Sequence, residues 1–162
     1  MKTREEAAAF FGGKPENTIF CLNCTHALNL AIQGIVQPND HVIISNLEHN
    51  AVLRPVAAMV RERGVQCSIA PVSVDDKETI AAFRARIRPN TRAMICTLAS
   101  NVTGQILPYR ELAALCNEHD ICMIADGAQA CGTLPVQMSD GINILCTCLL
   151  YTSDAADDLI GV

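Results

Sequence analysis

Short apolar runs alternate along the chain with longer stretches in which apolar residues recur every three or four positions. The short runs predict strands at residues 18–22, 41–45, 65–72, 91–99, 121–125 and 142–146. The longer stretches predict helices at residues 25–36, 50–64, 76–87 and 107–120, and the N-terminal residues are also helix-prone. Strands and helices that alternate at this spacing are typical of βαβ units in a mainly parallel sheet.

Turn and capping residues support several of these helix boundaries. Gly64 is placed to close the second predicted helix, and Pro55 is expected within its first turns. Asp75 or Asp76 is a suitable N-cap for the third, and Pro108 stands near the start of the fourth.

The predicted strands are apolar on both faces, which is typical of a sheet covered by helices on both sides. The sequence therefore predicts an α/β fold. In such sheets, ligands bind at the carboxyl ends of the strands. The residues that follow each strand are the first place to look for chemistry.

Composition narrows the class of protein. The chain has 162 residues, enough for one domain with a core, and 50% of them are hydrophobic. A net charge of −5 and the lack of a basic stripe argue against a nucleic-acid partner. No apolar run reaches the ~18–20 residues that span a bilayer, so no membrane partner is expected. The first residues lack the apolar core of a signal peptide, which favours a cytoplasmic protein.

The nine cysteines are odd in number and scattered, and some, such as Cys96, lie inside apolar runs. They are interpreted as reduced thiols. Cys21 and Cys24 form a C-x-x-C pair, which zinc or redox chemistry could use. A zinc site would want a second pair at similar spacing, whereas Cys146 and Cys148 are only two positions apart. We therefore predict no metal.

Polar residues follow four of the predicted strands. Cys24 and Thr25 open a helix whose N-terminus suits a phosphate, although a plain N-cap would have the same pattern. His49 follows the strand at 41–45; taken alone, it is a surface or capping histidine. Asn101 follows the strand at 91–99; taken alone, it is a turn residue. Asp126 ends an apolar strand, where a carboxylate needs a cation or hydrogen bonds.

A phosphate site, a flat ring, an amide and a carboxylate together match one ligand, pyridoxal phosphate. A carboxylate beside its pyridine nitrogen keeps that nitrogen protonated, so that the ring accepts the electrons of a carbanion at the substrate α-carbon. On this hypothesis, the charge of Asp126 is paired with a pyridinium.

Four stretches carry a family resemblance: NCTHALNLAIQG, SNLEHNAVLRP, SNVTGQILP and DGAQACGTLPV. In this order and spacing they resemble the class V aminotransferase family of fold-type I pyridoxal-phosphate enzymes. The chain looks most like the cysteine desulfurase and selenocysteine lyase branch, over about residues 5–147. The resemblance implies that these residues are part of the large domain of such an enzyme.

The resemblance implies a phosphate site at the start of the first predicted helix. There, Thr25 would hold the cofactor phosphate together with the backbone of Cys24 and His26. The branch often has Glu where this chain has His26, which leaves the role of that side chain open.

The resemblance also implies roles around the cofactor ring. His49 would stack on the pyridine ring and help to move protons, and Asp126 would pair with the pyridine nitrogen. Asn101 would lie beside the ring oxygen and the substrate, and Gln129 would hydrogen-bond the ring oxygen.

The chain departs from the family where a lysine should form the Schiff base with the cofactor. Its three lysines, Lys2, Lys14 and Lys77, all precede Asp126. The match stops at about Thr147, so residues 1–147 are interpreted as a partial large domain of a longer protein. Residues 148–158 resemble the translation of a sequencing-library adapter, and residues 148–162 are therefore interpreted as a tail of non-natural origin.

The resemblance implies that the parent protein converts L-cysteine to L-alanine and passes the sulfur on as a persulfide. It also implies a homodimer and a possible sulfur-acceptor protein. The fragment itself is expected to be inactive without the lysine. Two alternatives stay open: a class V transaminase or related lyase, and a non-catalytic α/β binding module.

Overall fold

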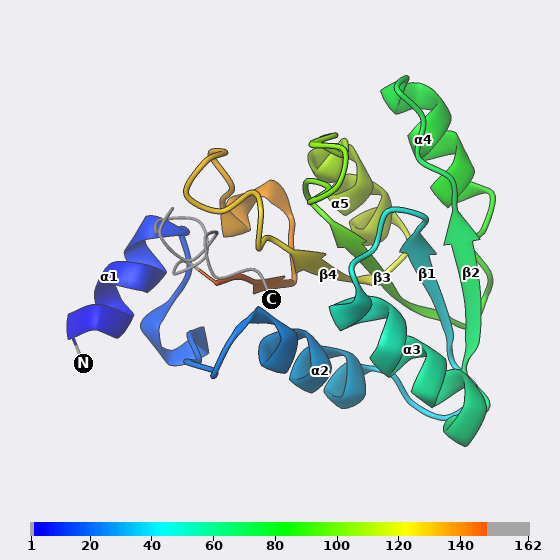
Figure 1. Cartoon of the computed structure of the whole chain (residues 1–162), viewed down its shortest axis with the longest axis horizontal. Coiled ribbons are helices and arrows are strands. Elements are labelled where there is room, and N and C mark those ends of the chain that lie inside the picture. Colours follow the sequence, from blue (N-terminus) through cyan, green and yellow to red (C-terminus); the bar gives the residue numbers. More distant parts are fainter. Residues whose placement is uncertain (1, 149–162) are drawn as a thin grey trace.

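The structure is a computed structural model, and it describes residues 2–148 (Figure 1). The tail expected at residues 148–162 lies outside the described residues, apart from Cys148. Five strands form one sheet in the order β2-β1-β3-β4-β5, and every pairing is parallel. The strands are β1 (His41–Ser45), β2 (Gln66–Ala70), β3 (Thr91–Thr97), β4 (Cys122–Asp126) and β5 (Ile144–Cys146). The predicted parallel α/β fold is confirmed.

Each predicted helix is present within a few residues of its expected bounds. The helices are α1 (Lys2–Phe10), α2 (Cys24–Ile35), α3 (Asn50–Arg63), α4 (Asp76–Arg84) and α5 (Tyr109–Glu118), with short 3-10 helices η1 (Pro15–Asn17) and η2 (Met138–Asp140). Gly64 ends α3 in the left-handed region at φ 67°, and Pro55 lies inside that helix. Asp75 is the cap of α4, because its side chain accepts the N–H of Lys77.

Helices lie on both sides of the sheet (Figure 1). The sheet separates two apolar clusters, and alternate residues of each strand belong to opposite clusters. In β1, Val42 and Ile44 pack with residues of α2 and α3. Ile43 packs instead with residues of α4 and α5, as does Met94 of β3. Both faces of the central strands β1, β3 and β4 are thus buried, which explains their apolar runs. The edge strand β2 is partly exposed.

The strand predicted at residues 18–22 is wrong. The segment runs between η1 and α2 without regular structure and joins none of the strands of the described chain. Its backbone bonds are local: Thr18 N donates to Pro15 O, and Leu22 N donates to the Nδ1 atom of His26. Ile19 and Leu22 are 77% and 88% exposed. An apolar run becomes a strand only where a sheet edge lies beside it, and sequence periodicity does not report that edge.

The strand order reverses direction at one point, between β1 and β3. From β1 the chain crosses to β2 on one side, and β3, β4 and β5 follow on the other side. The connections on the two sides run over opposite faces of the sheet, so the loops that leave β1 and β3 diverge and leave a crevice at the carboxyl ends. The topology alone therefore places a binding site beside the ends of β1 and β3.

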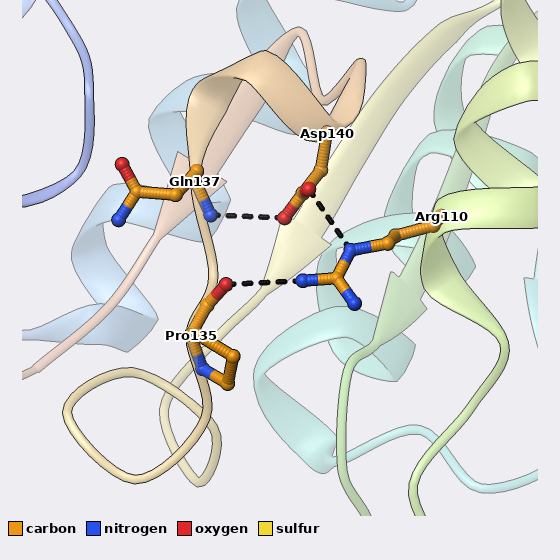
Figure 2. A network of polar contacts seen from close by, with 4 residues as sticks. All are labelled: Arg110, Pro135, Gln137 and Asp140. Atoms are coloured by element: carbon orange, nitrogen blue, oxygen red, sulfur yellow. Dashed lines mark hydrogen bonds and ion pairs between the residues drawn. The ribbon is translucent and has the colours of Figure 1, made fainter.

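A polar network fixes the long connection from β4 to β5 against α5 (Figure 2). The Nε atom of Arg110 donates to the Oδ1 atom of Asp140 over 2.9 Å, and its Nη2 atom donates to the carbonyl of Pro135 over 3.2 Å. Gln137 N donates to the other carboxylate oxygen of Asp140. The Gln137 side chain also donates to Phe10 O, so the same loop holds α1.

No helix in the part of the chain that the structure describes is long and apolar enough to cross a membrane.

Gly127 is required by the close approach of three segments directly after β4. Its N–H donates to the carbonyl of Cys146 in β5 over 2.8 Å. A Cβ atom at this position would lie 2.5 Å from the Sγ atom of Cys131 and 3.0 Å from a methyl carbon of Leu145. Both neighbours pack in the interior, so a methyl group here would force them apart.

We expect Gly127→Ala to lower the free energy of unfolding by about 1–3 kcal/mol, because it overpacks this junction. Gly34→Ala is the matched control: Gly34 lies in α2, and its added Cβ would meet nothing within 4 Å. That control should gain about 0.5–1 kcal/mol from the helix preference of alanine. Urea unfolding of both variants measures the difference, and equal stabilities would contradict the packing argument.

Candidate active site

A pocket of about 330 Å³ opens at the carboxyl ends of β1, β3 and β4. Six of the seven residues singled out in the sequence line it: Cys24, Thr25, His49, Asn101, Asp126 and Gln129. They come from four separate parts of the chain, which the parallel sheet gathers at one edge. His26 is the exception: it is exposed, and it does not line the pocket.

The N-terminus of α2 forms one end of the pocket. Asn23 is its N-cap, and the side-chain oxygen of Asn23 accepts the N–H of His26 over 2.8 Å. The Nδ1 atom of His26 faces back along the chain and accepts the N–H of Leu22. The first turn of the helix points its N–H groups and the positive end of its dipole toward the pocket, with the Thr25 side chain beside them. This end is suited to an anion.

His49 stands at the start of α3 as its N-cap. Its Nδ1 atom accepts the N–H of Ala51 over 3.1 Å. A ring nitrogen that accepts a hydrogen bond carries no proton, so the proton of the neutral ring lies on Nε2. The backbone bond thus fixes both the tautomer and the direction of an exposed ring on the pocket wall.

Asp126 is the last residue of β4 and is only 4% exposed. Its Oδ1 atom accepts the N–H of Ala128 over 3.0 Å and the thiol of Cys24 over 3.5 Å. Its Oδ2 atom has no hydrogen-bond partner among residues 2–148, and no Lys or Arg lines the pocket. Its carboxylate is largely removed from water and has one oxygen open to the pocket, so a ligand that supplies a donor or a positive charge there would stabilise it.

Cys24 supports that carboxylate as a neutral thiol. Burial raises the pKa of the Cys24 thiol far above its usual range, and the negative charge of Asp126 adds to the shift. The thiolate is the nucleophilic form of cysteine, so Cys24 is not equipped to attack a substrate. The sequence assigned only the backbone of Cys24 to a site; the side-chain contact, 102 residues apart in the chain, appears only in the fold.

Asn101 and Gln129 complete the polar lining. Both are exposed on the pocket wall, and neither side chain makes a hydrogen bond within the described chain. Each amide offers donors and an acceptor to a bound molecule. They lie in the loops after β3 and β4, the two strands whose ends carry Thr97 and Asp126.

Sequence reasoning missed Glu48, which lies directly behind this pocket. Glu48 is 8% exposed, and its Oε1 atom accepts from the Ser45 hydroxyl and from Thr97 N. Burial raises the pKa of Glu48 to about 7; the two hydrogen bonds lower it, and Asp126 raises it further. In the sequence, a Glu in the loop after a strand is typical of a solvated side chain, and no local signal marks this one as buried.

Cys96, which the sequence placed inside an apolar run, is a fully buried packing residue of β3. Cys131 is fully buried as well, and burial raises the pKa of its thiol. Within residues 2–148, no group of three or more His, Cys, Asp or Glu side chains is arranged to hold a metal ion.

Comparison with known proteins gives a consistent picture. The family model of class V aminotransferases matches residues 1–145. A cysteine desulfurase of Serratia proteamaculans (strain 568) is 32% identical over 132 residues, which are 78% of this chain and 32% of that protein. A mitochondrial cysteine desulfurase of Arabidopsis thaliana is 29% identical over 139 residues, covering 83% of this chain and 30% of the relative.

The fold is also shared with a solved structure. The crystal structure of the cysteine desulfurase CsdA from Escherichia coli superposes with a TM-score of 0.81 at 21% identity, covering 89% of this chain and 38% of that one. The chain therefore spans about a third of the length of the proteins that it matches.

Proposed function

Because this chain belongs to the class V aminotransferase family, we propose that its pocket binds pyridoxal 5'-phosphate and that the whole protein is a cysteine desulfurase. The reaction would take L-cysteine to L-alanine and pass the sulfur to a thiolate as a persulfide. The names of the matched relatives support this substrate. The observation that carries the proposal is the buried Asp126 carboxylate, which has an oxygen open to a partner.

The residues present fit this cofactor at both of its charged ends. The start of α2 with Thr25 suits the phosphate, and Asp126 suits a protonated pyridine nitrogen. The His49 ring would lie against the cofactor ring, and Asn101 and Gln129 would bind polar groups at its edge. When bound, the cofactor supplies an electron sink for charge at the substrate α-carbon.

The side chains of this pocket would orient the cofactor and move protons. Asp126 would hold the proton on the ring nitrogen, while the Cys24 thiol and Ala128 N keep its carboxylate fixed. The Nε2 atom of His49 carries the proton of the neutral ring, so it would donate a hydrogen bond to the cofactor or substrate; accepting a proton at this atom requires the other tautomer. Cys24 would not receive the sulfur, because burial raises its thiol pKa.

We further propose partners that follow from the same family: L-cysteine as substrate, a second copy of the whole protein in a homodimer, and a sulfur-acceptor protein. A cytoplasmic location is proposed with them. The Arabidopsis relative, by contrast, is described as mitochondrial.

One observation favours a second function for the 162-residue chain itself, a non-catalytic binding module. Its lysines are Lys2 in α1, Lys14 before η1 and Lys77 in α4, and none of them lines the pocket. A covalent link to the cofactor therefore has no donor among the described residues. A transaminase or related lyase remains the alternative within the family.

We expect Asp126→Asn to weaken the binding of pyridoxal 5'-phosphate by tenfold or more, the size of a lost charge-assisted hydrogen bond of about 1.5–3 kcal/mol. Asp120→Asn is the matched control, because Asp120 is an exposed residue before β4 with φ 56°, a conformation that asparagine tolerates. Quenching of intrinsic tyrosine fluorescence gives both affinities. Equal affinities of the two variants would show that the Asp126 carboxylate does not bind the cofactor.

We expect the purified 162-residue chain to release no sulfide or alanine from L-cysteine, with or without added pyridoxal 5'-phosphate. The reason is the lack of a lysine at the pocket. Sulfide and alanine assays in the presence of a thiol reductant measure this. Turnover above that of a boiled sample would overturn the expectation.

We also propose that residues 148–162 do not belong to the natural protein, since residues 148–158 resemble a translated library adapter. A DNA read from the original source across the codon of Thr147 should diverge from the present sequence at Cys148 and continue into a segment that contains a lysine. Independent clones that encode CLLYTSDAADD would contradict it.

A further inference from the structure

Glu48 is a buried carboxyl that none of the proposed roles uses. It lies in the loop between β1 and α3, directly before His49, yet only 8% of it is exposed. Its Oε2 atom is the one buried side-chain nitrogen or oxygen without a hydrogen-bond partner within residues 2–148. A buried oxygen without a hydrogen-bond partner lowers the free energy of unfolding, so packing alone does not explain a carboxyl at this position.

The Oε1 atom of Glu48 joins the two strands that flank the switch point of the sheet. It accepts from the hydroxyl of Ser45, the last residue of β1, and from the N–H of Thr97, the last residue of β3. The Ser45 hydroxyl in turn accepts the N–H of Leu47. One carboxyl oxygen therefore closes the turn after β1 and fastens it to the neighbouring strand.

This attachment determines where the following residue can lie. His49 comes next in the chain, and its ring is exposed on the pocket wall with Nδ1 bonded to Ala51 N. Thr97 also lines the pocket, and its hydroxyl donates to the carbonyl of Ala99, another lining residue. The bonds of Glu48 thus connect the walls that β1 and β3 contribute to the pocket.

We propose that Glu48 is a positioning residue, whose buried carboxyl ties the ends of β1 and β3 together and so fixes the His49 ring on the pocket. This role rests on the proposed function, because it matters for binding only if the His49 ring lies against the cofactor. The geometry that it describes exists in the unliganded chain and can be tested there.

The charges around Glu48 give the proposal a pH signature. The titratable groups facing it are Asp126 on β4 and the Cys96 thiol on β3, and neither can supply a positive charge. Burial raises the pKa of Glu48 to about 7, against about 4.3 for a glutamate in an unfolded chain. Between these two pKa values the folded chain holds a proton on Glu48 that the unfolded chain has released. This proton's contribution to the free energy of unfolding is full below about pH 4.3 and is lost as the pH rises through about 7.

The first measurement is the tautomer of His49 in the full chain, by long-range ¹H–¹⁵N correlation of the four histidine rings. His49→Asn assigns the signal. The native chain should show the Nε2–H form, and Glu48→Gln should keep it because the amide oxygen replaces Oε1. Glu48→Ala should move His49 toward a mixture of tautomers and weaken pyridoxal 5'-phosphate binding several-fold. Asn50→Ala, on the other side of His49, is the control and should change neither.

Several outcomes would overturn the proposal. One is a folded Glu48→Ala chain that keeps the native His49 pattern and the native cofactor affinity. If Glu48→Ala does not fold, Ser45→Ala removes one of the bonds to Oε1, and an unchanged His49 pattern in that variant would have the same meaning. If the chain does not bind pyridoxal 5'-phosphate, the proposed function is refuted. The tautomer of His49, measured without the cofactor, still tests the role of Glu48.

The pH profile of unfolding supplies an independent check. The native chain should lose stability between about pH 4.3 and 7 relative to Glu48→Gln, which is neutral throughout. Equal slopes for the two chains in urea unfolding would show that the carboxyl is not held as a neutral buried acid. That result would contradict the buried position of the carboxyl, from which the proposal starts.

Discussion

The buried carboxylate of Asp126 is the constraint on which the rest of this site depends. A strand that is buried on both faces carries it into the interior, where the Cys24 thiol and Ala128 N occupy only one of its oxygens. The other oxygen is open to a ligand, because no Lys or Arg among residues 2–148 lines the pocket. The arrangement is stable enough to persist only because the fold around it is held by many other contacts.

Two sets of those contacts hold the segment that follows the Asp126 carboxylate. Gly127 lets the chain turn against β5 directly after Asp126, where a larger residue would meet Cys131 and Leu145. The connection that follows is fastened to α5 by Arg110, which bonds both Asp140 and the carbonyl of Pro135 (Figure 2). Residues far from the pocket thus restrict the loop that carries Gln129.

The sequence was sufficient to predict the fold and most of the lining because both depend on strong local patterns. Buried parallel strands need apolar runs, and their carboxyl ends meet at one edge, so the residues after 41–45, 91–99 and 121–125 could be assigned to one place. The same reasoning failed at residues 18–22, because no strand edge lies beside that apolar run. It also missed Glu48 and the thiol of Cys24, whose partners at Thr97 and Asp126 are distant in the chain.

The charge pattern of the pocket follows from one helix and one strand. Cys24 and Thr25 are neighbours in the first turn of α2: the first touches the Asp126 carboxylate, and the second stands where the helix dipole is positive. A positive and a negative end are thereby placed in a single pocket, with the His49 ring on its wall. This arrangement supports the proposal that the pocket binds a flat molecule with an anionic group at one end and a protonated nitrogen at the other. Burial raises the pKa of Glu48 to about 7, which disfavours a second negative charge beside Asp126.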